Sequence, residues 1–307
     1  MKYRGIVYDV GLRFVTGHPY SVEPFDPALV RYDMNAIAGE MQANAVRIEG
    51  EETERLVIAS RIAHEAGLTV FFNPWKMNVA VDELPAYFRE TARAAETLRT
   101  EGLDIVFVCG CEMTLFNQGI FPGETVMERV AWLGTQSEHG ASAEATHEMS
   151  KKSEQLNDVF RSVASAVRDV YSGKMTYSAG SWEKVDWSRF DITGVDYYRY
   201  DESAEEYVAG LERPGLTSRS WSWRLAAAVM WGRQQKARGD SCCWKVRTLT
   251  APESLQETLF LCAVNKSRRI MWKSNWGCLK TQELKACSSM FSLSRPTVWA
   301  KAPRIWT

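Results

Sequence analysis

Carboxylates, an arginine, an asparagine and aromatic residues follow a series of short apolar runs in this 307-residue chain. The residues at the ends of these runs are Asp9; Arg47 and Glu49; Asn73 and Trp75; Cys111 and Glu112; Tyr177, with Trp182 in the next loop; and Asp196, Tyr197 and Tyr198. Aromatic faces stack on sugar rings, and paired carboxylates catalyse glycoside hydrolysis. If the runs are parallel strands, their ends meet on one rim, and the set indicates a carbohydrate site.

Glu112 is the sharpest candidate in this set. It follows an apolar run and stands in the sequence Gly110-Cys111-Glu112. A carboxyl group at the end of a buried strand is partly desolvated, which raises its pKa and suits a general acid. The alternative is a structural ion pair with Arg47, and Arg47 itself could orient a second carboxylate or substrate hydroxyls.

The remaining candidates also have two interpretations each. Trp75 and Trp182 could be sugar platforms or loop packing, and Asp196-Tyr197-Tyr198 could place a phenol beside a carboxylate or end a strand with half-buried tyrosines. Cys111 is expected to be a small core residue rather than a nucleophile, because no histidine is placed to activate it. The four histidines, at positions 18, 64, 139 and 147, show no metal-ligand spacing, so neither a metal nor another cofactor is expected.

Strands alternating with helices must position these residues. The predicted strands are Gly5–Val10, Ala45–Glu49, Thr69–Pro74, Asp104–Glu112, Lys174–Ser178 and Ile192–Tyr198. Helices are predicted from Asp26-Pro27 to about Gln42, over Glu54–Ala66 before Gly67, over Leu84–Thr100, and over Ser150–Val170.

Six strands with helices between them indicate a parallel α/β sheet, either a (β/α)8 barrel or a doubly wound sheet. No glycine-rich phosphate loop follows the first strand, which argues against a dinucleotide-binding fold. We therefore predict a (β/α)8 barrel.

Composition narrows the cellular setting. No apolar run approaches the length of a membrane span, and the chain enters a strand directly after Met1, so neither a membrane segment nor a signal peptide is expected. Cys109 and Cys111 fall in a buried run, and nothing suggests a disulfide framework, so the expected location is the reducing cytoplasm.

The net charge of −1 conceals a division of the chain near residue 212. Residues 1–212 hold 20 Lys and Arg against 34 Asp and Glu, whereas residues 213–307 hold 17 against 4. The second part also has 8 of the 12 Trp, none of the 11 Tyr and none of the His. A basic tail of this kind usually indicates a nucleic-acid-binding arm. Its tryptophans follow no strand or helix period, so they form no regular stacking surface. Nucleic-acid binding is therefore only the third function considered.

Several motifs together resemble a bacterial family of glycosidase-superfamily barrels often described as abortive (phage) infection proteins. They are Asn44–Ile48, Val106–Phe116, Gly194–Tyr198, the opening Gly5–Gly11 and the Phe25-Asp26-Pro27 helix start. The resemblance covers about residues 3–212. It implies a barrel in which an acid/base Glu ends strand four and a nucleophilic Glu ends strand seven. Glu112 fits the first role, but Cys111 precedes it where catalytic members of the wider clan usually have Asn.

The tail departs from that family pattern. The family carries a strand-seven run of the type Val-Val-x-Glu-x-Gly-Cys-Cys, whereas this chain has the tryptophan-rich segment 218–232. Because Trp has one codon, a shift of the reading frame turns each Trp into part of a Leu, Met or Val codon. With permitted codons, Leu216–Gln234 re-reads to include Val-Val-Val-Met-Glu-Val-Gly-Cys-Cys, and Gly277–Ser292 re-reads as a helix end and an apolar strand. The alternative is a genuine basic C-terminal domain.

We therefore predict a glycosidase-like barrel portion over residues 1–212, with about six of eight βα units and open edges at the first and sixth strands. Residues 213–307 are predicted to be an out-of-frame, poorly ordered tail with few contacts to the barrel. The chain is expected to act on or bind carbohydrate and to be inactive as a hydrolase. The alternative is a non-catalytic phage-defence or sugar-binding barrel. The sequence predicts no oligomeric state.

Overall fold

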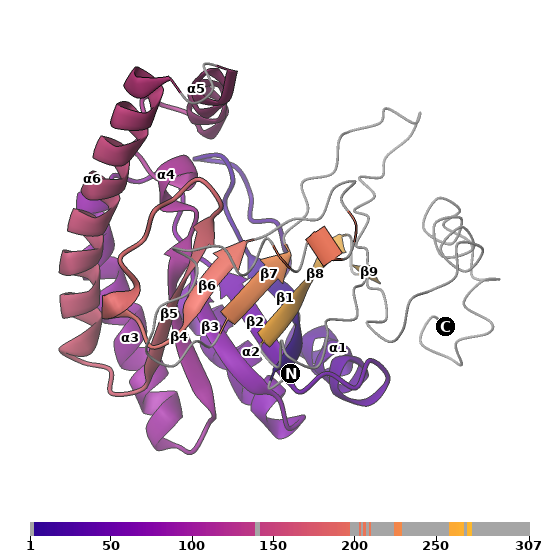
Figure 1. The fold of residues 1–307 in the computed structure, drawn as a ribbon. Helices are drawn as coiled ribbons and strands as arrows, with labels where there is room; N and C mark the ends of the chain where they lie inside the picture. The colour runs from indigo at the N-terminus through magenta and orange to yellow at the C-terminus, as the bar shows by residue number, and fades with distance from the viewer. Residues whose placement is uncertain are drawn as a thin grey trace.

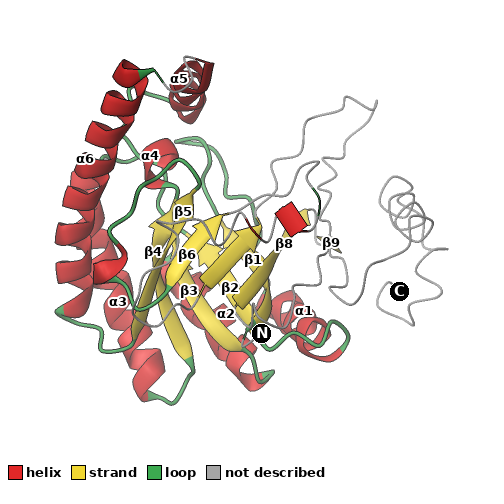
Figure 2. Ribbon diagram, in the orientation of Figure 1, coloured by secondary structure: helices red, strands yellow, loops and turns green. Residues whose placement is uncertain are grey.

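A computed structural model describes residues 3–138, 142–196, 203, 205–206 and 209, together with the backbone of residues 224–228, 258–266 and 269–271. Strands form a central sheet, and helices lie outside it (Figure 1 and Figure 2). In chain order the elements are β1 (Arg4–Gly11), α1 (Pro27–Gly39), β2 (Ala45–Gly50), α2 (Thr53–Glu65), β3 (Thr69–Pro74), η1 (Val81–Glu83), α3 (Leu84–Thr100), β4 (Ile105–Cys111), α4 (Met113–Phe116), α5 (Val126–Glu138), α6 (Ala143–Arg168), β5 (Lys174–Gly180), η2 (Trp187–Arg189), β6 (Thr193–Asp196), β7 (Arg224–Ala228), β8 (Thr258–Lys266) and β9 (Arg269–Met271).

The six strands predicted from the sequence are present and pair in parallel, in chain order from β1 to β6. With the helices between them, they confirm the predicted α/β barrel class. Both faces of these strands are buried, as parallel strands covered by helices require.

The prediction that β1 and β6 are open edges is wrong. The backbone of β7 pairs with β6 and β8, and β8 pairs with β1 through residues Arg4 to Tyr8, so the ring of eight parallel strands is closed. The prediction of few contacts between the tail and the barrel therefore does not hold for these two strands. Closure removes the unpaired strand edges that would otherwise promote aggregation.

Local sequence explains the helix positions. Pro27 occupies the first turn of α1, and the Asp26 side chain accepts a hydrogen bond from the Ala28 amide at 2.9 Å, as a helix N-cap does. Gly67 adopts a φ of 79° just after α2, the left-handed conformation that favours glycine.

One correction concerns the later helices. The helix predicted over Ser150–Val170 begins earlier, at Ala143, where Ser142 caps it by accepting from the Ala145 amide. No helix was named between the fifth and sixth predicted strands, and the connection from Gly180 to Thr193 holds only the short 3-10 turn η2.

Two apolar clusters stabilise the barrel. The larger lies between the strands and helices, where α3 contributes Leu84, Phe88, Ala92 and Ala95 along one face. The smaller, called the inner apolar cluster below, lies inside the barrel and consists of Tyr3, Val7, Ala45, Phe71, Val106, Val108 and Ile192. Side chains alternate between the two faces of a strand, so the members of this cluster identify the other inward-facing positions on each strand.

Candidate functional site

Arg47 points into the barrel interior from β2, where its register partners Val7 and Phe71 belong to the inner apolar cluster. Its side chain is fully buried. Its Nη1 donates to Ser178 Oγ at 2.6 Å and lies 3.5 Å from Asp196 Oδ1. Because β2 is a neighbour of neither β5 nor β6 in the sheet, these contacts can form only across the barrel interior.

Six inward side chains surround this position and are called the mouth cluster below: Arg47, Glu49, Asn73, Cys111, Ser178 and Asp196. The Asn73 amide oxygen, when turned toward the guanidinium, accepts from Arg47 Nη2 at 3.0 Å and from Nε at 3.1 Å. Glu49 Oε2 lies 3.6 Å from Arg47 Nη2. Five strands therefore contribute to one polar layer at the carboxyl end of the barrel, where barrel enzymes carry their sites.

Asp196 is held by three donors. Its Oδ1 accepts from Ser178 Oγ at 2.6 Å and faces Arg47, and its Oδ2 accepts from Cys111 Sγ at 3.0 Å. Burial, together with the charge of Asp196, raises the pKa of the Cys111 thiol well above its usual range, although Arg47 opposes the rise. Cys111 is therefore a buried, neutral thiol that donates a hydrogen bond within this polar layer.

The carboxylates outnumber the cation in this layer. Burial is the main cause that raises the pKa of Glu49 to about 8, with Asp9 and Asp196 adding to the rise while Arg47 and Asn73 oppose it. Burial likewise raises the pKa of Asp9 to about 6, against hydrogen bonds from Ser21 and Gly11. Burial also disfavours the charge of Arg47, but Cys111, Asp196 and Glu49 outweigh it and raise its pKa. The guanidinium stays charged at neutral pH, and its charge counters the burial that favours the neutral form of Glu49.

A bulge in β4 aims the residues that carry the predicted acid. The β4–β5 register shifts between Val108 and Cys111, and Gly110 adopts a φ of 84°. This extra residue turns Cys111, rather than Gly110, toward the interior, as bulges beside active sites often re-aim a side chain.

Glu112 stands directly after the bulge in the left-handed region, with φ 41° and ψ 51°. A residue with a side chain pays roughly 1–2 kcal/mol for this conformation. Its backbone N–H donates to the Ser178 carbonyl at 2.9 Å, and its side chain is buried. Strain of this kind persists where surrounding contacts enforce it, and functional sites are common among such places.

Two buried polar atoms near the mouth cluster have no hydrogen-bond partner among the described residues. One is Glu49 Oε2, an acceptor, and the other is Trp75 Nε1, a donor. Glu49 and Asn73 are register partners on β2 and β3, and the Trp75 amide continues this pairing by donating to the Gly50 carbonyl at 2.9 Å. Trp75 is 4% exposed and packs edge-on against Phe116, with ring centroids 4.8 Å apart.

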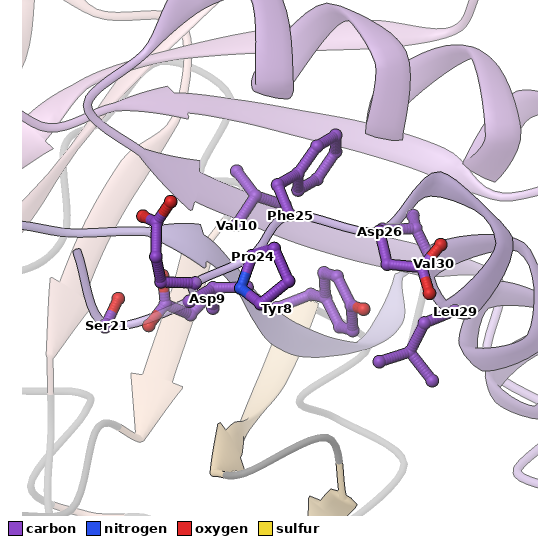
Figure 3. A pocket seen from close by; sticks show the side chains of 11 residues that line it. Tyr8, Asp9, Val10, Ser21, Pro24, Phe25, Asp26, Leu29 and Val30 are labelled. Atoms are coloured by element: carbon purple, nitrogen blue, oxygen red, sulfur yellow. The ribbon is translucent and has the colours of Figure 1, made fainter. Parts of the chain in front are cut away.

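Asp9 stands apart from the guanidinium. It is the register partner of Glu49, but its Oδ1 accepts from the Gly11 amide at 2.7 Å. Figure 3 shows Asp9 on a cavity of about 280 Å³ between β1, the loop that follows it and the start of α1. Among the predicted site residues, Asp9 alone lines this cavity, so the cavity is beside the mouth cluster rather than part of it.

Tyr177 and Trp182 lie elsewhere than the sequence suggested. Ser178 faces inward, so its neighbour Tyr177 faces the helices, where its ring lies 4.5 Å from that of Phe160. Its hydroxyl accepts from the Met113 amide at 2.7 Å. Trp182 Nε1 donates to Thr114 Oγ1 at 3.0 Å. Both side chains therefore support the turn after Glu112 and do not line the mouth cluster. Tyr197 and Tyr198 lie outside the described residues.

Sequence reasoning missed two important residues, Ser178 and Glu183. Ser178 links Arg47 to Asp196, and Glu183 is a buried carboxylate that accepts four hydrogen bonds around the turn after β4. Alternation along β5 could have identified Ser178 as the inward residue. Glu183 lies in a loop, where no periodic signal marks burial.

No group of three or more His, Cys, Asp or Glu in the described part of the chain could hold a metal ion. None of the helices described is both long enough and apolar enough to cross a membrane.

The comparisons with known proteins establish the fold. No protein-family model and no curated protein matches the sequence. A GH113 beta-1,4-mannanase solved as a complex is 12% identical, with a TM-score of 0.55 over 95% of this chain and 100% of that chain. A second GH113 beta-1,4-mannanase structure is 11% identical, with a TM-score of 0.51 over 95% and 99%. At these identities the similarity is one of architecture, and it supports the α/β barrel.

Proposed function

We propose that the mouth of the barrel binds a carbohydrate, and that this chain does not hydrolyse it. The observation that carries the proposal is a pair of buried atoms, Glu49 Oε2 and Trp75 Nε1, that have no hydrogen-bond partner among the described residues. A buried polar atom left without a partner costs about 1–3 kcal/mol. A sugar hydroxyl can both donate and accept, so one class of ligand satisfies both atoms.

The rest of the mouth cluster suits the same ligand. The Arg47 guanidinium and the Asn73 amide are held rigidly by their own contacts, so little ordering is needed when a polar ligand binds. Mannanases share the barrel architecture. We therefore include β-1,4-linked manno-oligosaccharides among the probes, beside gluco- and xylo-oligosaccharides.

The absence of hydrolysis follows from the carboxylates. Glycoside hydrolysis requires two carboxyl groups on opposite sides of the scissile bond, and we assign Glu112 as the acid. Asp196 cannot serve as the second, because Ser178, Cys111 and Arg47 occupy its oxygens. The sequence holds no acidic residue between Glu212 and Asp240, so none accompanies β7.

A second proposal concerns the origin of residues 213–307 and explains why the strand-seven Glu is absent. We attribute residues 213–307 to a one-base change of frame between about Leu211 and Ser218, because charge, Trp and Tyr content all change there. In the restored frame a Glu returns to strand seven. Sequencing the gene across codons 205–225 tests this directly. A verified gene with no barrel motif in either alternative frame would exclude it.

Calorimetric titration with the oligosaccharide panel tests the binding proposal. We expect binding by the chain as it stands, and at least about tenfold weaker binding by Glu49→Gln and Trp75→Phe, which corresponds to about 1.4 kcal/mol. The exposed carboxylate Glu65 supplies the matched control Glu65→Gln, with unchanged affinity. Absence of binding to every probe would reject the proposal.

Hydrolysis is tested with aryl glycosides. The present chain should release aryl alcohol at the background rate, whereas a frame-restored chain should show activity that Glu112→Gln removes. Equal turnover by both chains would show that the C-terminal part supplies chemistry that we assign to strand seven. The phage-defence role implied by the resemblance stays a prediction, to be measured as phage plating efficiency on cells that express either chain.

A further inference from the structure

Glu183 lies in the tight turn after β5 and contacts a different segment, the turn that follows β4. Its Oε1 accepts from the Thr114 amide at 3.1 Å and from Thr114 Oγ1 at 2.7 Å. Its Oε2 accepts from the Tyr177 hydroxyl at 2.9 Å and from the Gly180 amide at 2.9 Å. One buried carboxylate therefore joins two loops through four donors.

These contacts reach the residue directly after Glu112. The Tyr177 hydroxyl that donates to Glu183 also accepts from the Met113 amide at 2.7 Å. The amides of Met113 and Thr114 are the first two of α4, which a four-residue helix cannot satisfy internally. Glu183 and Tyr177 thus cap α4 from outside, in place of a side chain at the cap position itself, since Glu112 makes no capping hydrogen bond.

The cap bears on the strained conformation of Glu112. The left-handed φ of Glu112 is fixed on its amino side by the β4 bulge and by the hydrogen bond to the Ser178 carbonyl. On its carboxyl side, the Met113 and Thr114 contacts determine where the chain goes. A strained residue holds its conformation only when the surrounding structure enforces it from both sides.

We propose that Glu183 is a positioning residue that holds Glu112 at the barrel mouth by capping α4; the functional meaning of this role rests on the carbohydrate site proposed above. Glu183 does not itself contact the mouth cluster through any hydrogen bond described here. Four donors favour its ionised form, and they oppose the burial that raises its pKa to about 7.

The test compares Glu183→Gln with Asp186→Asn. Asp186 is a carboxylate in the same loop, but it accepts from the Ser188 amide and does not touch the turn after β4. Both substitutions replace a carboxyl group by an amide of nearly the same shape. In Glu183→Gln an NH2 group replaces one oxygen and faces donors. We expect amide hydrogen exchange of Met113 and Thr114 to accelerate by about tenfold or more in Glu183→Gln alone, with exchange of the β4 amide of Phe107 unchanged.

A double-mutant cycle in oligosaccharide affinity separates positioning from general stability. Glu183→Gln should weaken binding about tenfold in the parent chain and less than about twofold in the Glu112→Gln background, because its effect acts through Glu112. If Glu183→Gln does not fold, Tyr177→Phe removes the acceptor of the Met113 amide instead. The conservative control is Thr114→Ser, which keeps the hydroxyl and should behave like the parent chain.

The outcomes are distinct. Unchanged exchange at Met113 and Thr114 would overturn the capping role, and equal losses in both backgrounds would overturn positioning through Glu112. If the parent binds no sugar, the carbohydrate proposal fails, and the exchange measurement alone decides whether Glu183 holds the turn.

Discussion

Replacing Arg47 by Met removes the only cation of the mouth cluster while keeping much of the side-chain volume. Asp196 and Glu49 would then lose their ion pairs at 3.5 and 3.6 Å, and Ser178 and Asn73 would lose hydrogen bonds. Removing one partner of a buried ion pair typically costs about 3–5 kcal/mol, because the other charge stays buried. We expect a loss in unfolding free energy of about that size at pH 8.

The loss should depend on pH with a defined sign. Arg47 lowers the pKa values of Glu49 and Asp196, so in the variant both rise further above their unfolded values. A carboxyl group whose folded pKa is raised contributes stability at low pH and loses it as pH rises through that pKa. The deficit of Arg47→Met should therefore be smaller at pH 5 than at pH 8.

Urea unfolding at both pH values measures this deficit. The matched control is Arg31→Met, since Arg31 forms an ion pair with Glu65 that is exposed and screened by water, so its loss should change the unfolding free energy little. Adding Asp196→Asn to Arg47→Met should recover part of the loss. A deficit below about 1 kcal/mol, or one that is constant with pH, would refute the account of Arg47 as the charge that holds the cluster together.

Three further outcomes follow from other contacts. Burial raises the pKa of Asp33 to about 7, so Asp33→Asn should gain stability relative to the parent as pH rises from about 4 to 8, measured by urea unfolding; a constant difference would contradict the assignment. Cys111, a buried neutral thiol, should resist iodoacetamide at pH 8 until urea unfolds the chain, as peptide mass spectrometry would show, and rapid labelling of the native protein would disprove its burial. A Cβ on Gly194 would lie 2.2 Å from the Tyr177 carbonyl oxygen, so Gly194→Ala should lower the melting temperature by several degrees through separation of β5 and β6, and an unchanged melting temperature would argue against this close approach.

The sequence predicted the strands better than their closure. Apolar runs bounded by glycine and charged residues gave β3 with its observed ends and β1 and β2 to within a residue, because a buried parallel strand leaves a continuous apolar signature. Closure depends on backbone pairing of β7 (Arg224–Ala228) and β8 (Thr258–Lys266). β8 does carry an apolar run, Leu259–Val264, but it lies in the part of the chain that was interpreted as out of frame, and the small residues of β7 give little strand signal, so the pairing was missed.

The candidate site was predicted where strand periodicity applies. Arg47, Glu49, Asn73 and Asp196 were named from strand ends, and the structure brings them together. Tyr177 was placed on the wrong face, because a one-residue difference in register exchanges the two faces of a strand. The network around Glu183 could not be foreseen, since it joins two loops whose approach is set by the whole barrel.

The indole N–H resonance of Trp75 gives the most direct test of the carbohydrate site. Its Nε1 is buried and donates no hydrogen bond to the described residues, and Trp75→Phe identifies its signal among the 12 tryptophans. On addition of an oligosaccharide that binds, the account predicts a saturable shift of this resonance and slower exchange of its proton, both absent in Glu49→Gln. A bound sugar that leaves the Trp75 resonance unmoved would place the ligand elsewhere and contradict the proposed site.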